Sequence, residues 1–125
     1  MTVSSHLIDR MTRSVVVLIR SDPETSHRAV EGVRIALGLA SGDHAVEVIL
    51  TGRAPLLLTP DTNGLIDGEM AEKFLSTLQE FIPTFYIDQE SAKEVDLSES
   101  DYKTVPLSKK EIAEKIAAAQ RFALF

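Results

Sequence analysis

The fold of this chain is decided by two apolar stretches, Ser14-Val15-Val16-Val17-Leu18-Ile19-Arg20 and Ala45-Val46-Glu47-Val48-Ile49-Leu50-Thr51. Both are short runs of β-branched and aliphatic residues, which is typical of strands that are covered on both faces in a parallel sheet. Between them, the apolar residues of segment 29–40 cover more than a narrow stripe, which predicts a well-buried helix. The order strand, helix, strand predicts a βαβ unit and the α/β class.

The sequence also predicts where that helix begins and ends. Asp22-Pro23-Glu24-Thr25 offers a capping carboxylate, a proline at the first helical position and an acid in the first turn. We therefore expect the helix to begin here, with Asp22 as its N-cap. Gly42 is expected to end the helix in the left-handed conformation.

The alternation of strands and helices continues to the end of the sequence. Residues 52–68 are rich in proline, glycine and asparagine, which predicts a long irregular connection. We then expect a helix over 69–81, a strand over 84–87, a helical turn over 89–94, a strand over 102–105, a helix over 108–119 and a strand over 121–125. Ser108 and Glu111 have the spacing of a capping box. The predicted fold is a three-layer α/β/α sandwich with a mostly parallel, Rossmann/flavodoxin-like five-stranded sheet.

Composition indicates one domain and excludes several kinds of partner. A chain of 125 residues suits a single domain, which we assign to 14–125, preceded by a flexible tail over 1–13. The net charge of −6 argues against nucleic acid and anionic membranes as partners. No apolar run approaches the roughly 20 residues that cross a bilayer, so we expect a cytoplasmic protein.

The sequence carries no recognised catalytic, cofactor or metal motif. It has no cysteine, which excludes a thiol nucleophile and a thiolate metal site. His6, His27 and His44 lack the spacing that gathers metal ligands on one helix face. No nucleophile elbow and no phosphate-binding glycine loop follows a predicted strand. We expect no cofactor, no metal and no catalytic residue, so an enzymatic role is uncertain and a non-enzymatic one is favoured.

Candidate ligand-binding residues follow the predicted strands, because ligands of open α/β sheets bind beyond the carboxyl ends of the strands. Arg53 offers a charge for an anion, or it is a solvated or interface arginine. Asp88 and Glu90 offer a carboxylate pair for acid/base chemistry or a weak cation site, or they are solvated loop acids. The full set of candidates is Ser21, Asp22, Thr25, Gly52, Arg53, Asp88, Gln89 and Glu90.

A run of three leucines, Leu56, Leu57 and Leu58, lies inside the irregular connection. Exposing these side chains is unfavourable, so we expect either a neighbouring subunit or a helix of the same chain to cover them. Of these two interpretations, the subunit interface is favoured.

Three segments resemble the DsrE/DsrF/TusD-like superfamily of small α/β proteins, which includes sulfur-relay subunits. They are Gly42-Asp43-His44-Ala45-Val46-Glu47-Val48, Gly52-Arg53-Ala54 and the closing Ala118-Ala119-Gln120-Arg121-Phe122-Ala123-Leu124-Phe125. In sulfur-carrying members a cysteine ends the third strand, and Ile87 or Asp88 occupies that place here. Neither side chain can form the sulfur–sulfur bond of a persulfide.

The resemblance implies a non-catalytic, oligomeric DsrE-like protein, for example an accessory subunit in sulfur relay or sulfur metabolism. The expected partners are further copies of the chain, as a trimer or hexamer, or a cysteine-bearing relative in a hetero-oligomer. The alternative is a small-molecule (anion) binding protein or an enzyme that uses the pocket at the carboxyl ends of the strands.

Overall fold

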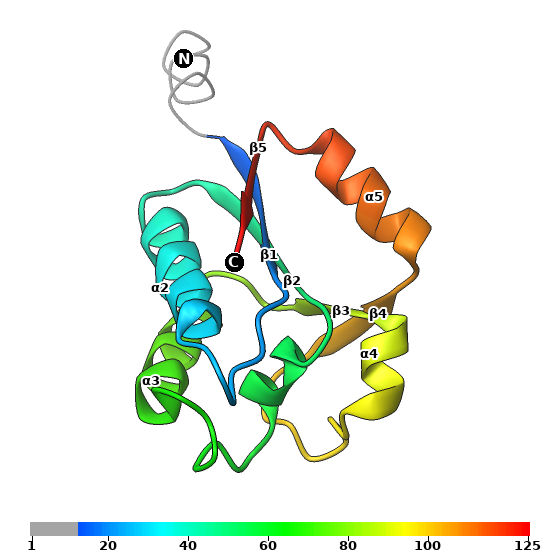
Figure 1. The fold of residues 1–125 in the computed structure, drawn as a ribbon. Helices are drawn as coiled ribbons and strands as arrows, with labels where there is room; N and C mark the ends of the chain where they lie inside the picture. The colour runs from blue at the N-terminus through cyan, green and yellow to red at the C-terminus, as the bar shows by residue number, and fades with distance from the viewer. Residues whose placement is uncertain (1–12) are drawn as a thin grey trace, which may run out of the picture.

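The computed structural model describes residues 13–125, which form a five-stranded sheet with helices on both faces (Figure 1). The strands lie in the order β4-β3-β2-β1-β5. All four neighbouring pairs are parallel, so the α/β prediction is confirmed with a sheet that is parallel throughout rather than mostly. The predicted tail lies outside the described residues apart from Arg13, and so does His6.

The order of elements along the chain agrees with the sequence prediction. The strands are β1 (Ser14–Ile19), β2 (Ala45–Leu50), β3 (Phe85–Asp88), β4 (Thr104–Leu107) and β5 (Arg121–Leu124). The α-helices are α2 (Arg28–Ser41), α3 (Gly68–Leu78), α4 (Gln89–Glu94) and α5 (Lys109–Ala118), and one 3₁₀ helix, η1 (Ala54–Leu58), lies in the connection after β2. Within residues 13–125, no helix is both long and apolar enough to cross a membrane.

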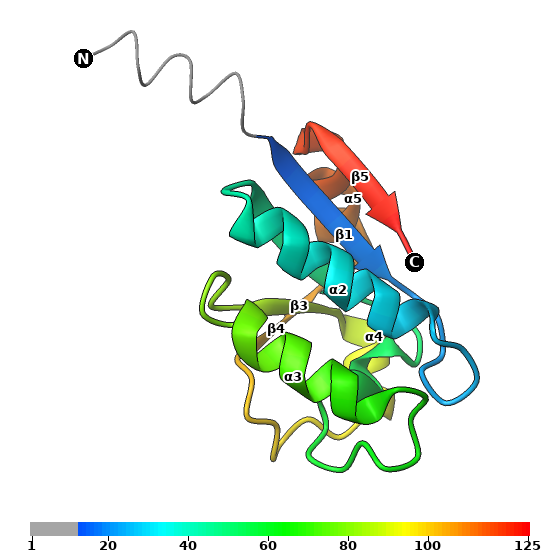
Figure 2. The same ribbon diagram turned by 90° about the vertical axis from the view of Figure 1, so that its left-hand side faces the viewer.

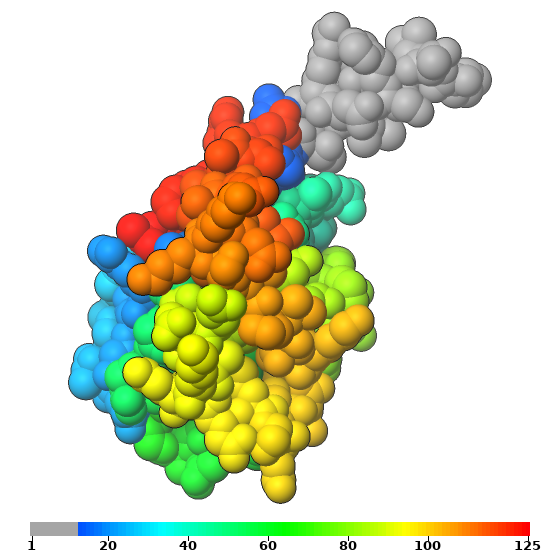
Figure 3. Space-filling model, turned by 90° about the vertical axis from the view of Figure 1, so that its right-hand side faces the viewer, coloured from blue at the N-terminus to red at the C-terminus, as the bar shows by residue number. Residues whose placement is uncertain are grey.

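The sheet separates two apolar clusters of different size. Helices α2 and α3 cover one face, where Val15, Val17 and Ile19 of β1 join the larger cluster (Figures 1 and 2). Helix α5 covers the other face with α4 below it, and Val16 packs there with Ile112 of α5 (Figures 1 and 3). Because side chains alternate along a strand, one apolar run supplies both clusters.

Helix α2 begins later than the sequence predicts. It starts at Arg28, and Asp22 belongs to a preceding turn in which its carbonyl oxygen accepts from the N–H groups of Thr25 (3.1 Å) and Ser26 (2.9 Å). The Pro23 carbonyl accepts from Ile66 N–H at 2.8 Å, which ties this turn to the connection before α3. The N-cap role predicted for Asp22 is therefore wrong, because a long-range contact holds these residues as a loop.

The end of the same helix also differs from the prediction. Gly42 follows α2 with φ −89°, and Asp43 adopts the left-handed conformation with φ 68°. Aspartate tolerates this region better than most residues. The N–H groups of Asp43 and His44 then reach the last helical carbonyls, those of Ala40 and Leu39, both at 3.1 Å.

Further along the chain, β4 begins two residues later than the predicted 102–105. Tyr102 lies before the strand, and its ring packs edge-to-face against Phe85, with ring centroids 5.6 Å apart. Aromatic pairs of this geometry contribute beyond the area they bury. Phe85 is fully buried in the larger cluster, so the contact closes the core beside β3.

The capping box at the start of α5 is confirmed. Glu111 N–H donates to Ser108 Oγ at 3.1 Å, and Ser108 N–H donates to Glu111 Oε1 at 3.0 Å. Ser108→Ala should lower the free energy of unfolding by about 1 kcal/mol, measured by urea denaturation. Ser98→Ala, in the loop before β4, is the matched control: it removes a hydroxyl that bonds to the exposed Asp96 and caps no helix, so it should change the free energy of unfolding less.

The same box should make the stability of the domain depend on pH. The hydrogen bond from Ser108 N–H lowers the pKa of Glu111. A carboxylate with a lowered pKa contributes stability above its unfolded-state pKa, and this contribution is lost as the pH falls through the folded-state value. Glu111→Gln should therefore flatten the acid limb of the stability curve, whereas an unchanged curve would contradict this role.

Candidate functional site

The carboxyl ends of β1 and β2 lie side by side, and each is followed by a polar loop. Register pairs Ile19 with Leu50, the last residues of the two strands, and Thr51 N–H donates to the Ile19 carbonyl at 2.9 Å. Gly52 then turns the chain with φ 60°, a conformation that glycine adopts without strain. This turn presents Arg53 to the loop after β1.

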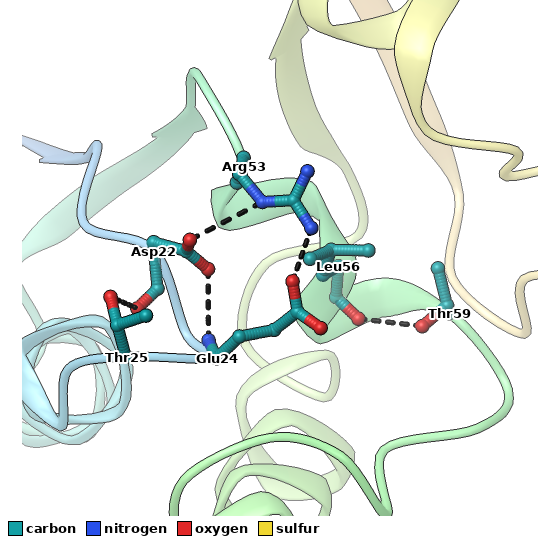
Figure 4. A network of polar contacts seen from close by, with 6 residues as sticks. All are labelled: Asp22, Glu24, Thr25, Arg53, Leu56 and Thr59. Atoms are coloured by element: carbon teal, nitrogen blue, oxygen red, sulfur yellow. Dashed lines mark hydrogen bonds and ion pairs between the residues drawn. The ribbon is translucent and has the colours of Figure 1, made fainter.

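Three of the residues around this edge form one polar cluster (Figure 4). Arg53 Nε lies 3.3 Å from Asp22 Oδ2, and Arg53 Nη2 donates to Glu24 Oε1. Asp22 Oδ1 also accepts from Glu24 N–H at 2.9 Å. The structure therefore brings together the candidates Asp22 and Arg53 and adds Glu24, for which the sequence predicts only a place in the first turn of the helix.

Two carboxylates surround the single guanidinium of this cluster. The hydrogen bond to Glu24 is the main reason why the pKa of Arg53 is raised, followed by the charges of Glu24 and Asp22. The three groups carry a net negative charge, and more than half of the Arg53 side chain is exposed. An incoming anion would compete with both carboxylates for Arg53. This geometry therefore suits an ion pair that joins the loops after β1 and β2 better than it suits an anion-binding site.

The remaining candidates of the first two loops do not converge on a binding centre. Thr25 is exposed, and its hydroxyl contacts the Asp22 carbonyl at 3.5 Å (Figure 4). Ser21 is half-buried, and its N–H donates to the Phe125 carbonyl at 3.4 Å. These contacts are local to the loop or join it to β5.

The third group of candidates lies at the carboxyl end of β3. Asp88 caps α4: its carboxylate accepts from Glu90 N–H and from Ser91 Oγ, both at 3.5 Å. Glu90 pairs with Lys93 at 3.6 Å, while Gln89 is exposed. Asp88 and Glu90 thus have separate partners, and within residues 13–125 no hydrogen bond or ion pair joins them to Arg53.

The leucine run of η1 belongs largely to the core of the chain itself. Leu57 and Leu58 are buried in the larger apolar cluster, and only Leu56 is half-buried. A proline in the first turn starts the 3₁₀ helix, which rotates these two leucines inward. The prediction that a neighbouring subunit covers Leu57 and Leu58 is therefore wrong, and the alternative, burial by the same chain, holds.

A cavity of about 1000 Å³ opens near the amino ends of β1 and β2, beside α5. Lys115 Nζ lies there 2.7 Å from Glu47 Oε2 and 4.3 Å from the Tyr86 ring centre. The hydrogen bond to Glu47 raises the pKa of Lys115. Sequence reasoning missed this group, although Glu47 is the one charge in an otherwise apolar strand and was the available signal.

A smaller cavity of about 250 Å³ lies between η1 and α3, where Thr59, Glu72 and Tyr102 contribute to its walls. None of the eight candidates predicted from the strand ends lines this cavity or the larger one. Neither described histidine lies at the strand-end site: His44 Nδ1 accepts from Arg13 N–H at 3.0 Å, and His27 is exposed before α2.

Comparisons with known proteins agree with this architecture. The model of the DsrE/DsrF-like family matches residues 13–123. Among solved structures, the chain is similar to the YchN protein from E. coli, with a TM-score of 0.74 and 14% identity over 92% of this chain and 100% of that one. No curated protein matches the chain significantly. At this identity, the structural similarity shows the fold alone.

Proposed function

Because the chain belongs to the DsrE/DsrF-like family, we propose that it acts as a non-catalytic subunit that is accessory to sulfur relay or sulfur metabolism. The observation that supports this role lies at the carboxyl end of β3, where Asp88 is the N-cap residue of α4. The resemblance puts the cysteine of sulfur-carrying members at this end of the strand. The present chain contains no cysteine at any position.

The chemistry of sulfur transfer explains why the missing thiol matters. A carrier holds sulfur as a persulfide, which needs a thiolate for its sulfur–sulfur bond. The carboxylate of Asp88 cannot form that bond, and its oxygens accept hydrogen bonds from Glu90 and Ser91 instead. A role through assembly, with a cysteine-bearing relative as the sulfur carrier, is consistent with both facts.

The competing role, an anion-binding protein or enzyme anchored by Arg53, has weaker support. Arg53 already has Asp22 and Glu24 as partners, and the described cavities lie elsewhere. Two variants, Arg53→Ala and Asp88→Asn, would test this anion-binding role. If the role is correct, each variant should lose ligand binding and keep the oligomeric state of the wild type.

Native mass spectrometry of the endogenous protein, gently isolated from its source cells, tests the proposed function. The expected result is a complex that contains this chain and a cysteine-bearing protein. A homo-oligomer or a monomer without such a partner would contradict the accessory role. A homo-oligomer that carries a discrete extra mass would favour the anion-binding alternative.

A further inference from the structure

Strand β5 leaves one long side of its backbone without a neighbouring strand in the described part of the chain. Phe125, directly after the strand, donates its N–H to Leu18 at 2.9 Å and accepts from Arg20 N–H at 2.8 Å. Since backbone groups alternate in direction along a strand, Phe122 and Leu124 point theirs away from β1. Phe122 therefore offers both of its backbone groups at the edge of the sheet and Leu124 offers its N–H, whereas the Leu124 carbonyl accepts from Arg28 Nη2.

The side chains of the same two residues are apolar and exposed. Phe122 is 46% exposed and Leu124 is 38% exposed. Both lie on the α5 face of the sheet, opposite Val16 and Leu18 in the β1–β5 register. Proteins usually protect a free edge with charges, proline or a covering element, so a pair of exposed apolar residues on an edge strand marks a surface suited to a partner.

The opposite face of β5 carries positive charge. Arg121 lies on that face together with Phe125, and Arg28 of α2 lies 5.8 Å from the centre of the Phe125 ring. Arg28 Nη2 also donates to the outward-facing Leu124 carbonyl at 3.3 Å, so its charge reaches the edge itself. Figure 2 shows the beginning of α2 beside the end of β5.

The structure shows no acidic partner for these arginines within residues 13–125. Among the described residues, neither Arg28 nor Arg121 takes part in an ion pair, although the whole chain has a net charge of −6. The edge of β5 is therefore a local basic strip on an acidic protein. Charge complementarity favours an acidic partner for it.

Pairing with β5 of a second copy would fit this edge badly. In the antiparallel register that pairs Phe122 with Leu124 of the second copy, and so overlaps the two strands most fully, Arg121 lies opposite Phe125 of that copy. Arg28 of that copy lies over the same ring, so two arginines would meet at each end of the seam. Like charges across a strand pair are destabilising, which argues for a different chain as the partner.

We propose that the outer edge of β5 accepts an extended strand from a different protein, in which apolar and acidic residues alternate. The apolar side chains would pack on Phe122 and Leu124, and the carboxylates would face Arg28 and Arg121. Strand addition of this kind takes affinity from main-chain hydrogen bonds and specificity from alternate side chains. The inference rests on the proposed role as an assembly subunit and defines the chemistry of its partner.

A titration with the peptide acetyl-Glu-Val-Glu-Val-Glu-amide, followed by NMR of the full chain, tests this edge. We expect shifts centred on β5 and binding that weakens as salt increases. The double variant Arg28→Glu/Arg121→Glu should bind at least about tenfold more weakly. The control Lys103→Glu/Lys109→Glu, at the two ends of the opposite edge strand β4, makes the same change in net charge and should bind as the wild type does.

A second pair of variants separates strand addition from simple charge attraction. Phe122→Pro removes an outward N–H without removing a bond to β1, and proline is tolerated on edge strands. It should bind the peptide several-fold more weakly than Phe122→Ala, which loses only the ring, with both checked for folding by circular dichroism. Equal binding by these two variants would overturn the proposal.

Other outcomes of the titration would also overturn it. They are no binding of the glutamate peptide, equal binding of acetyl-Lys-Val-Lys-Val-Lys-amide, or shifts centred on β4. A homodimer that is lost in Phe122→Pro would identify a second copy as the occupant instead. The two experiments can fail independently of each other. If native mass spectrometry finds a complex with a cysteine-bearing protein but the β5 edge binds no peptide, the accessory role stands and the proposal for the edge is wrong.

Discussion

Leu57→Asp is expected to prevent the domain from folding. Leu57 is 1% exposed and packs in the larger apolar cluster between η1 and its neighbours. Truncating a buried leucine alone costs about 2–5 kcal/mol. The aspartate adds the cost of an unpaired buried charge. Together the two costs exceed the free energy of unfolding of a typical small domain, about 5–15 kcal/mol. Far-UV circular dichroism and thermal melting should show a chain without a cooperative transition.

The neighbouring Leu56 provides a matched control. Its side chain is half-buried at the surface of η1, so Leu56→Asp should remain folded and lose only a small part of its thermal stability. If Leu57→Asp instead stayed folded and only changed the native mass, Leu57 would lie in a subunit interface and its place in the core would be wrong.

Gly68→Ala is expected to lower the free energy of unfolding by about 3 kcal/mol, the upper part of the range for inserting a methyl group into a packed site. A Cβ at this position would overlap the backbone carbonyl oxygen of Thr62. Neither partner moves easily, because the Gly68 N–H donates to the Leu65 carbonyl at 3.3 Å and the Thr62 carbonyl accepts from the Leu65 N–H at 3.0 Å. Urea denaturation followed by circular dichroism measures the loss.

Gly64→Ala is the control for this prediction, since it makes the same chemical change in the same connection. A Cβ at Gly64 would have no atom within 4 Å apart from those of its neighbours in the chain, and the φ of Gly64 is not positive. The expected change is within about 1 kcal/mol, and a small gain would reflect a less flexible unfolded chain. Equal losses in both variants would show that the contact with Thr62 does not determine the result.

Local patterns were sufficient to predict much of the fold. The β-branched runs gave β1 and β2, and the spacing of Ser108 and Glu111 gave the start of α5, which its capping box confirms. Each of these signals depends on residues that are close in sequence. The α/β class followed from their order along the chain.

The candidate site depended on contacts between residues that are distant in sequence. Asp22 has the local chemistry of an N-cap, but Arg53 and the Pro23–Ile66 hydrogen bond hold its segment as a loop. The run of three leucines in η1 indicated that these side chains are buried, but it did not indicate which part of the protein buries them. The partners of Glu47 and of the β5 edge likewise come from other elements, so a single segment does not reveal them.

The pairing of β1 with β5 has a consequence for how the protein is made. Gln120, just before β5, bonds to Ser14 at the start of β1 across a sequence separation of 106 residues. Synthesis proceeds from the amino terminus, so β1 can pair with β2 long before its other neighbour exists. During that interval one side of an apolar central strand is an open edge. This edge of the nascent chain therefore stays open to misassociation until β5 has left the ribosome, and pairing across so long a sequence separation is slow.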